Sequence, residues 1–142
     1  MTSKNDALCL ILGPLDGEFD LVRETINEIL VGLGIRPIRI DDRTYGIHLS
    51  ESVLQDIAKA DLIIADITGS NPNVMYELGF AHALKKPVLQ IVEKEAGNIP
   101  FDLAGSLYYT YDSPKRPNEI KKFKEKFGET IANWAQRSLS YA

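Results

Sequence analysis

Residues 60–88 read ADLIIADITGSNPNVMYELGFAHALKKPV, and this stretch carries the patterns of a strand, a helix and a second strand in succession. The mainly apolar run Leu62–Asp66 has the length of a buried strand. Asn71 can cap a following helix, and Pro72 suits the first helical position, where a missing N–H costs nothing. The apolar run Val88–Val92 then resumes the strand pattern. This order predicts a βαβ unit and therefore a parallel sheet.

The same alternation of short apolar runs and longer helical segments continues on both sides of this unit. The predicted strands are Leu8–Leu12, Ile35–Ile40, Leu62–Asp66, Val88–Val92 and Leu107–Thr110. Five strands in this alternation are typical of a three-layer α/β fold with a parallel sheet of flavodoxin-like order 2-1-3-4-5. Because 142 residues correspond to about one domain, we expect residues 1–142 to form a single domain.

The helical segments have recognisable faces and ends. The first has an apolar stripe within Phe19–Leu33 and a suitable C-cap in Gly34. The second is predicted over Ser50–Lys59, with Ser50 or Ser52 as its N-cap. The last has an apolar stripe that we expect in the core, formed by Ile120, Phe123, Phe127, Ile131 and Trp134.

The composition narrows the classes of partner. With 44% hydrophobic and 25% charged residues, and no apolar run near the roughly 18 residues that span a bilayer, no membrane partner is expected. Met1–Asp6 lacks a leader pattern, which favours a cytoplasmic location. With a net charge of −4, the chain lacks the excess of basic residues that is typical of proteins that bind duplex nucleic acid. The basic stretch Lys115–Lys126 is interpreted as a solvated helix face. Cys9 has no second thiol with which to form a disulfide or a metal site.

A sheet of this order binds ligands where the winding reverses, between strands 1 and 3. The first strand would be followed there by residues 13–17, and the third by residues 66–73, which are rich in turn-forming and hydrogen-bonding side chains. Asp66 has two interpretations, as an acceptor of backbone N–H groups in its own loop or as a ligand contact. Capping alone would explain Asn71.

Glu77 is the most informative residue of the chain. On a helical wheel it falls inside an apolar arc that we expect to face the sheet, formed by Val74, Leu78, Ala81, Leu84 and Phe80. A buried carboxylate must be neutral, paired or at the edge of a wet cavity. The structural alternative is a glutamate that a hydroxyl or a backbone N–H satisfies, or an arc drawn too wide. The functional one is a nucleophile at the crevice, suited to breaking an N-glycosidic bond.

The sequence lacks the motifs that other common catalytic and nucleotide-binding sites require. The chain has no Walker loop, no dinucleotide-binding glycine motif after the first strand and no G-x-S-x-G elbow. His48 and His82 do not combine with the single cysteine into a metal-ligand pattern, so no metal is expected.

Residues 60–84 and 86–88, with Gly13-Pro14 and Ile99–Leu103, resemble the core of the nucleoside 2-deoxyribosyltransferase-like superfamily, of which NAD-hydrolysing TIR domains are structurally similar relatives. The resemblance implies that Glu77, in its E-x-G context, is the catalytic glutamate. It also implies a binding pocket after the first strand and around the glutamate. The candidate substrate-binding residues are Gly13, Pro14, Leu15, Asp41, Asp66, Thr68, Asn71 and Asn73.

Two departures from the family pattern bear on the substrate. The deoxyribosyltransferases usually have an acidic residue several positions before the glutamate, where this chain has Asn71 and Asn73. Asparagine cannot act as a general acid, which favours a good leaving group such as the nicotinamide of NAD. The Trp-Cys-containing approach to the glutamate in TIR domains is replaced by Val74, Met75 and Tyr76.

These features together predict a hydrolase or transferase that cleaves the N-glycosidic bond of NAD or of a deoxynucleoside or deoxynucleotide. NAD would be a substrate, and no cofactor is expected. The relatives suggest a homo-oligomer. The alternatives are a nucleotide-binding sensor without turnover and a TIR-like signalling module that acts only when clustered.

Overall fold

The computed structural model describes residues 6–14, 17–39, 49–94 and 108–140. Its centre is a sheet in which every pair of neighbouring strands is parallel. The strand order is β2-β1-β3-β4-β5, so the predicted α/β fold with order 2-1-3-4-5 is confirmed. The strands are β1 (Leu8–Leu12), β2 (Arg36–Arg39), β3 (Leu62–Asp66), β4 (Val88–Glu93) and β5 (Tyr109–Tyr111).

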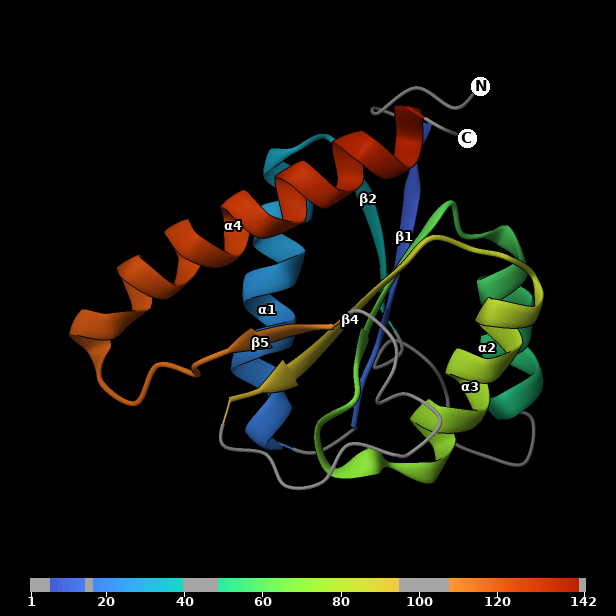
Figure 1. Cartoon of the computed structure of the whole chain (residues 1–142), viewed down its shortest axis with the longest axis horizontal. Coiled ribbons are helices and arrows are strands. Elements are labelled where there is room, and N and C mark those ends of the chain that lie inside the picture. Colours follow the sequence, from blue (N-terminus) through green and yellow to red (C-terminus); the bar gives the residue numbers. More distant parts are fainter. Residues whose placement is uncertain (1–5, 15–16, 40–48, 95–107, 141–142) are drawn as a thin grey trace.

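The helices cover both faces of this sheet and make it the middle of three layers (Figure 1). Helices α1 and α4 lie on one face, and α2 and α3 lie on the other. Their bounds are α1 (Gly17–Gly32), α2 (Leu49–Lys59), α3 (Pro72–Ala83) and α4 (Pro117–Ser140), with a short 3₁₀ turn, η3 (Thr68–Ser70), before α3. None of the helices in these described segments is long and apolar enough to cross a membrane.

The central strands are buried on both faces, which explains their continuous apolar runs. Successive side chains of a strand alternate between the two faces. In β3, Leu62 and Ile64 belong to the core under α1 and α4, and Ile63 and Ala65 belong to the core under α2 and α3. The apolar stripe of α4 packs in the core under α1 and α4 as expected from Phe123 onwards, with Phe127 and Ile131 almost inaccessible to solvent. Ile120 in the first turn of α4 was expected in this core but is only partly buried.

Several predicted boundaries differ from the structure, and β4 ends at Glu93, one residue later than predicted. Helix α2 begins at Leu49, so Ser50 and Ser52 lie inside its first turn and not at the N-cap position. Strand β5 extends to Tyr111, whose ring packs in the core and whose backbone carbonyl accepts the N–H of Lys94. The predicted start of this strand, Leu107, lies outside the described residues.

The second strand begins one residue later than predicted. Ile35 precedes β2 as a buried core residue, and its N–H is bonded to the carbonyl of Leu30 in the turn after α1. Gly34 occupies this turn with a φ of 78°, which accounts for a glycine at the end of α1. Ile40, the predicted end of the strand, lies outside the described residues.

Candidate functional site

The chain that leaves β3 is held at the carboxyl edge of the sheet by two side chains. Oδ1 of Asp66 accepts the backbone N–H of Thr68 at 2.8 Å. Oγ1 of Thr68 in turn accepts the N–H of Glu93, at the end of the neighbouring strand β4, at 2.9 Å. These bonds join the loop before α3 to the sheet. Gly69 and Ser70 follow with positive φ values, of 75° and 51°, and turn the chain into helix α3.

Asn71 caps α3, as the sequence predicted. Its Oδ1 accepts the backbone N–H groups of Asn73 at 2.9 Å and of Val74 at 3.3 Å, and Pro72 occupies the first helical position. The amide oxygen of Asn71 is therefore engaged in the cap. The side chain of Asn73 is exposed in the first turn and makes no hydrogen bond within the described part of the chain.

Glu77 lies in the second turn of α3, beside a buried stripe formed by Val74, Leu78 and Ala81. Its side chain is half-buried. It is the only Asp, Glu, Lys or Arg residue of the helix. Because Asn73 precedes it by four residues, the two side chains are neighbours on one helix face.

The apolar arc around Glu77 is narrower than the helical wheel predicted. Leu84 follows the last residue of α3 and is 43% exposed, so it does not belong to the arc. Phe80 is only partly buried at the margin of the core. Tyr76, directly before Glu77, is 62% exposed. Glu77 is therefore at the boundary between the core and the solvent.

Asp66 has the role of an internal acceptor. Its side chain is 1% exposed, and the hydroxyl of Tyr111 donates to its second carboxylate oxygen. Burial raises the pKa of Asp66, while hydrogen bonds from Thr68 and Tyr111 act in the opposite direction. Burial and the charge of Asp66 also raise the pKa of Tyr111. The side chain points towards the face covered by α1 and α4, whereas Glu77 belongs to a helix on the other face.

The loop after β1 is fixed by α1. A Cβ at Gly13 would lie 2.2 Å from Cε1 of Phe19, so only glycine fits beside this ring. Arg23 is 5% exposed, and its Nη2 donates to the carbonyl of Pro14 at 2.9 Å. The guanidinium stands 4.8 Å from the Phe19 ring centroid and pairs with Asp20 at 2.7 Å. The hydrogen bond from Arg23 on α1 thus fixes the start of this loop.

Sequence reasoning did not identify Arg23 as part of this arrangement. The available signal was an arginine four residues after Phe19, a spacing that places both side chains on one helix face. The contact with Pro14 joins residues nine positions apart and depends on the angle between β1 and α1.

The structure brings the two predicted loops to the same edge of the sheet, because Leu12 of β1 is aligned with Ala65 of β3. Gly13 and Pro14 follow the first of these strands, and residues 66–73 follow the second. Leu15 and Asp41 lie outside the described residues.

The donors needed for a metal centre do not gather in the described segments. No group of three or more His, Cys, Asp or Glu residues that could hold an ion occurs among these residues. Cys9 is buried in the core, and burial raises the pKa of its thiol far above the ordinary range, so the thiolate is disfavoured.

Three proteins of known structure share this fold. The TIR domain of the Toll-related receptor TRR-2 from Hydra magnipapillata matches with a TM-score of 0.61 and 18% identity, over 87% of this chain and 97% of that chain. The CMP N-glycosidase BcmB from Clostridium botulinum matches with a TM-score of 0.62 and 13% identity, over 88% and 98%. A 2-deoxyribosyltransferase from Bacillus psychrosaccharolyticus matches with a TM-score of 0.56 and 18% identity, over 75% and 87%. No protein-family model and no curated protein sequence matches the chain.

The resemblance of residues 60–88 to the deoxyribosyltransferase-like and TIR-like proteins is thereby confirmed as a likeness of fold. Two of the three proteins are enzymes that act on nucleotides or nucleosides.

Proposed function

We propose that this protein cleaves the N-glycosidic bond of a nucleotide, with Glu77 as its catalytic carboxylate. The observation that carries the proposal is the position of Glu77. It is a half-buried acid in a helix otherwise free of Asp, Glu, Lys and Arg, and this helix begins at the switch point of the sheet. Ligands of open α/β sheets bind at that point. The folds of an N-glycosidase and of a 2-deoxyribosyltransferase support the same reaction class.

The chemistry requires only one carboxylate. A carboxylate oxygen of Glu77 forms a bond to the anomeric carbon of the sugar while the bond from this carbon to the base nitrogen breaks. The electron pair of the broken carbon–nitrogen bond leaves with the base. Water or a second base then displaces the carboxylate. The attacking water, or the N–H of the second base, loses a proton in this step, which passes to the solvent or to a base that left as an anion, and Glu77 is regenerated as the carboxylate. The reaction is hydrolysis in the first case and transfer in the second.

The two asparagines favour a substrate whose base leaves without protonation. The amide oxygen of Asn71 is already bonded to the N-terminus of α3. Asn73 can bind a sugar hydroxyl or a base through its amide, but it cannot supply a proton. The nicotinamide of NAD leaves as a neutral base, so NAD is the first substrate to test, before deoxynucleosides and their 5′-phosphates.

The test is incubation of the purified chain with NAD and with a panel of nucleosides, deoxynucleosides and their 5′-phosphates, followed by chromatography of the released base. Glu77→Gln should lower the rate at least about 100-fold, because it removes the charge that stabilises the cationic transition state. Glu129→Gln changes an exposed acid on α4 and is the matched control, with a rate near that of the wild type.

Each outcome separates this proposal from its alternatives. A wild type without activity on any substrate, or a Glu77→Gln variant as active as the wild type, would contradict catalysis by Glu77. Saturable binding of a nucleotide without any product would instead indicate a sensor. The assay should also be run over a range of protein concentrations, because a rate per molecule that rises with concentration would indicate an enzyme that acts as a homo-oligomer or cluster.

A further inference from the structure

A pocket of about 470 Å³ lies between β5 and the N-terminal half of α4. It belongs to the face of the sheet that α1 and α4 cover, whereas the helix of Glu77 covers the other face. The pocket is therefore separate from the site of the proposed reaction. Its volume is within the range of about 300–1,000 Å³ that is usual for small-molecule sites.

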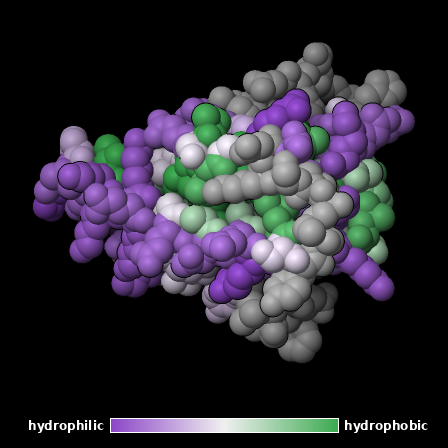
Figure 2. All heavy atoms as spheres, turned by 90° about the horizontal axis from the view of Figure 1, so that it is seen from above, coloured by the Kyte–Doolittle hydropathy of each residue, from purple (hydrophilic) through white to green (hydrophobic). Residues whose placement is uncertain are grey.

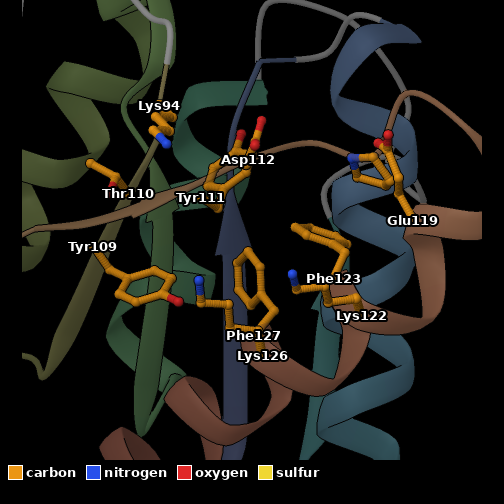
Figure 3. Close-up of a pocket in the computed structure, with 11 residues that line it drawn as sticks. Lys94, Tyr109, Thr110, Tyr111, Asp112, Glu119, Lys122, Phe123, Lys126 and Phe127 are labelled. Atoms are coloured by element: carbon orange, nitrogen blue, oxygen red, sulfur yellow. The ribbon is translucent and has the colours of Figure 1, made fainter.

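Four aromatic rings form the floor of this pocket. Phe127 lies at their centre, with ring centroids 5.2 Å from Phe123, 5.6 Å from Tyr111 and 6.1 Å from Tyr109. The side chains of Phe127, Phe123 and Tyr111 are buried, and that of Tyr109 is half-buried. Figure 3 shows these rings grouped between the strand and the helix. Tyr109 is the most accessible of the four, so a planar ring that entered the pocket would pack mainly against Tyr109 and the outer edge of this cluster.

Three lysines surround the floor and come from two separate parts of the chain. Lys94 follows β4, and Lys122 and Lys126 are one turn apart on α4. In Figure 3 their side chains lie around the aromatic rings. Within the described residues none of their ammonium groups forms an ion pair or a hydrogen bond. No described residue therefore pairs with these three charges.

The pocket has a positive balance in an acidic protein. Two carboxylates, Asp112 and Glu119, also line it, so its lysines exceed its acids by three to two, although the whole chain has a net charge of −4. Glu119 is already engaged, because its Oε2 accepts the backbone N–H of Lys115 at 2.9 Å at the start of α4. Figure 2 shows hydrophilic residues over the end of the molecule where this part of α4 projects beyond the strands of Figure 1.

We propose that this pocket binds an aromatic ring that carries a phosphate group. The aromatic floor accepts the ring, and the lysines around it bind the phosphate as point charges. The basic stretch Lys115–Lys126, interpreted from the sequence as a solvated helix face, thus contributes Lys122 and Lys126 to a binding site. Nothing in this inference depends on Glu77 or on cleavage of a glycosidic bond.

The experiment is isothermal titration of the full chain with 1-naphthyl phosphate, which has an aromatic ring and a phosphate but no glycosidic bond. 1-Naphthol and inorganic phosphate serve as the two half-ligands. We expect 1-naphthyl phosphate to bind saturably and at least about tenfold more tightly than either half-ligand, and to bind more weakly as salt screens the lysines. Absence of saturable binding, or equal affinity for a half-ligand, would overturn the proposal.

Substitutions of lysines inside and outside the pocket test where 1-naphthyl phosphate binds. The double variant Lys122→Gln and Lys126→Gln should weaken binding at least about tenfold, since two contacts with the phosphate are lost. The matched double variant Lys59→Gln and Lys121→Gln removes the same charge from exposed positions outside the pocket, and should bind within about twofold of the wild type. Glu77→Gln should bind like the wild type. Equal loss in both double variants, or loss only in Glu77→Gln, would place the ligand elsewhere and refute the proposal.

Discussion

The phenol hydroxyl of Tyr111 on β5 donates a hydrogen bond to Oδ2 of Asp66 at the end of β3, across the intervening strand β4. The other carboxylate oxygen of Asp66 accepts the N–H of Thr68 in the turn before α3. This pair therefore ties a three-residue edge strand to the loop of the candidate reaction site. The ring of Tyr111 also lines the pocket beside α4, so one residue contacts both regions.

Removing this hydroxyl should destabilise the fold. Tyr111→Phe keeps the ring but leaves the buried carboxylate of Asp66 without one of its donors, so the free energy of unfolding should fall by about 1–3 kcal/mol. Tyr109→Phe is the matched control, because the Tyr109 hydroxyl makes no hydrogen bond within the described residues, and its effect should stay within about 0.5 kcal/mol. Urea unfolding of both variants measures the difference. Equal stability of the two would show that the bond to Asp66 contributes nothing.

The buried carboxyl group of Asp66 should make stability depend on pH. Because burial raises its pKa, the folded state holds this proton more tightly than the unfolded state does. Its contribution is fully present below the unfolded pKa of about 4 and is lost as the pH rises through the raised folded pKa. Asp66→Asn removes this titration, so the stability of the variant relative to the wild type should increase as the pH rises.

Thermal unfolding of both proteins at a series of pH values from about 4 to about 8 tests this direction. Asp112→Asn removes an exposed carboxylate near the same edge of the sheet and controls for the loss of one acid. A difference between the Asp66→Asn variant and the wild type that is flat, or that decreases with pH, would contradict the assigned direction of the pKa shift.

A side chain at Gly13 should disturb the loop after β1. In Gly13→Ala the new Cβ would stand 2.2 Å from the ring of Phe19, which must then move against α1, and the expected loss is about 1–3 kcal/mol of unfolding free energy. Gly128→Ala is the control, because its Cβ would meet only Ile29 at 3.8 Å. This variant should gain about 0.5–1 kcal/mol from helix propensity. Chemical unfolding measures both values. A Gly13→Ala protein as stable as the wild type would show that the ring of Phe19 can move away without a loss of stability.

The two asparagines before Glu77 should separate stability from activity. Asn71→Ala removes the cap of α3 and should cost about 0.5–2 kcal/mol of unfolding free energy. Asn73→Ala removes an exposed side chain and should change stability by less than about 0.5 kcal/mol. If Asn73 binds the substrate beside Glu77, its loss should still lower kcat/KM roughly tenfold. Unfolding curves and rates with NAD test the two effects, and an Asn73→Ala variant with unchanged kcat/KM would remove this residue from the site.

Much of the fold could be predicted because its signals are local. The apolar runs of β1, β3 and β4 indicate buried parallel strands, and their alternation with helices restricts the topology to few orders. The cap formed by Asn71 and Pro72 was equally visible, since its bonds join residues within three positions. The boundaries of α2 and β5 differ from the predicted ones, because a helix or strand end depends on contacts as well as on propensity.

The amino-acid sequence by itself determined the succession of strands and helices along the chain, the start of α3 and the presence of one acidic residue near its buried stripe. Only the tertiary structure decided what lies around these features. It placed the donor of Tyr111 on Asp66, forty-five residues away, and the guanidinium of Arg23 on the carbonyl of Pro14. It also brought Lys94 and Lys126 around one aromatic floor. The physical reason is that backbone preferences act within a few residues, whereas burial and side-chain pairing arise only when distant segments pack together.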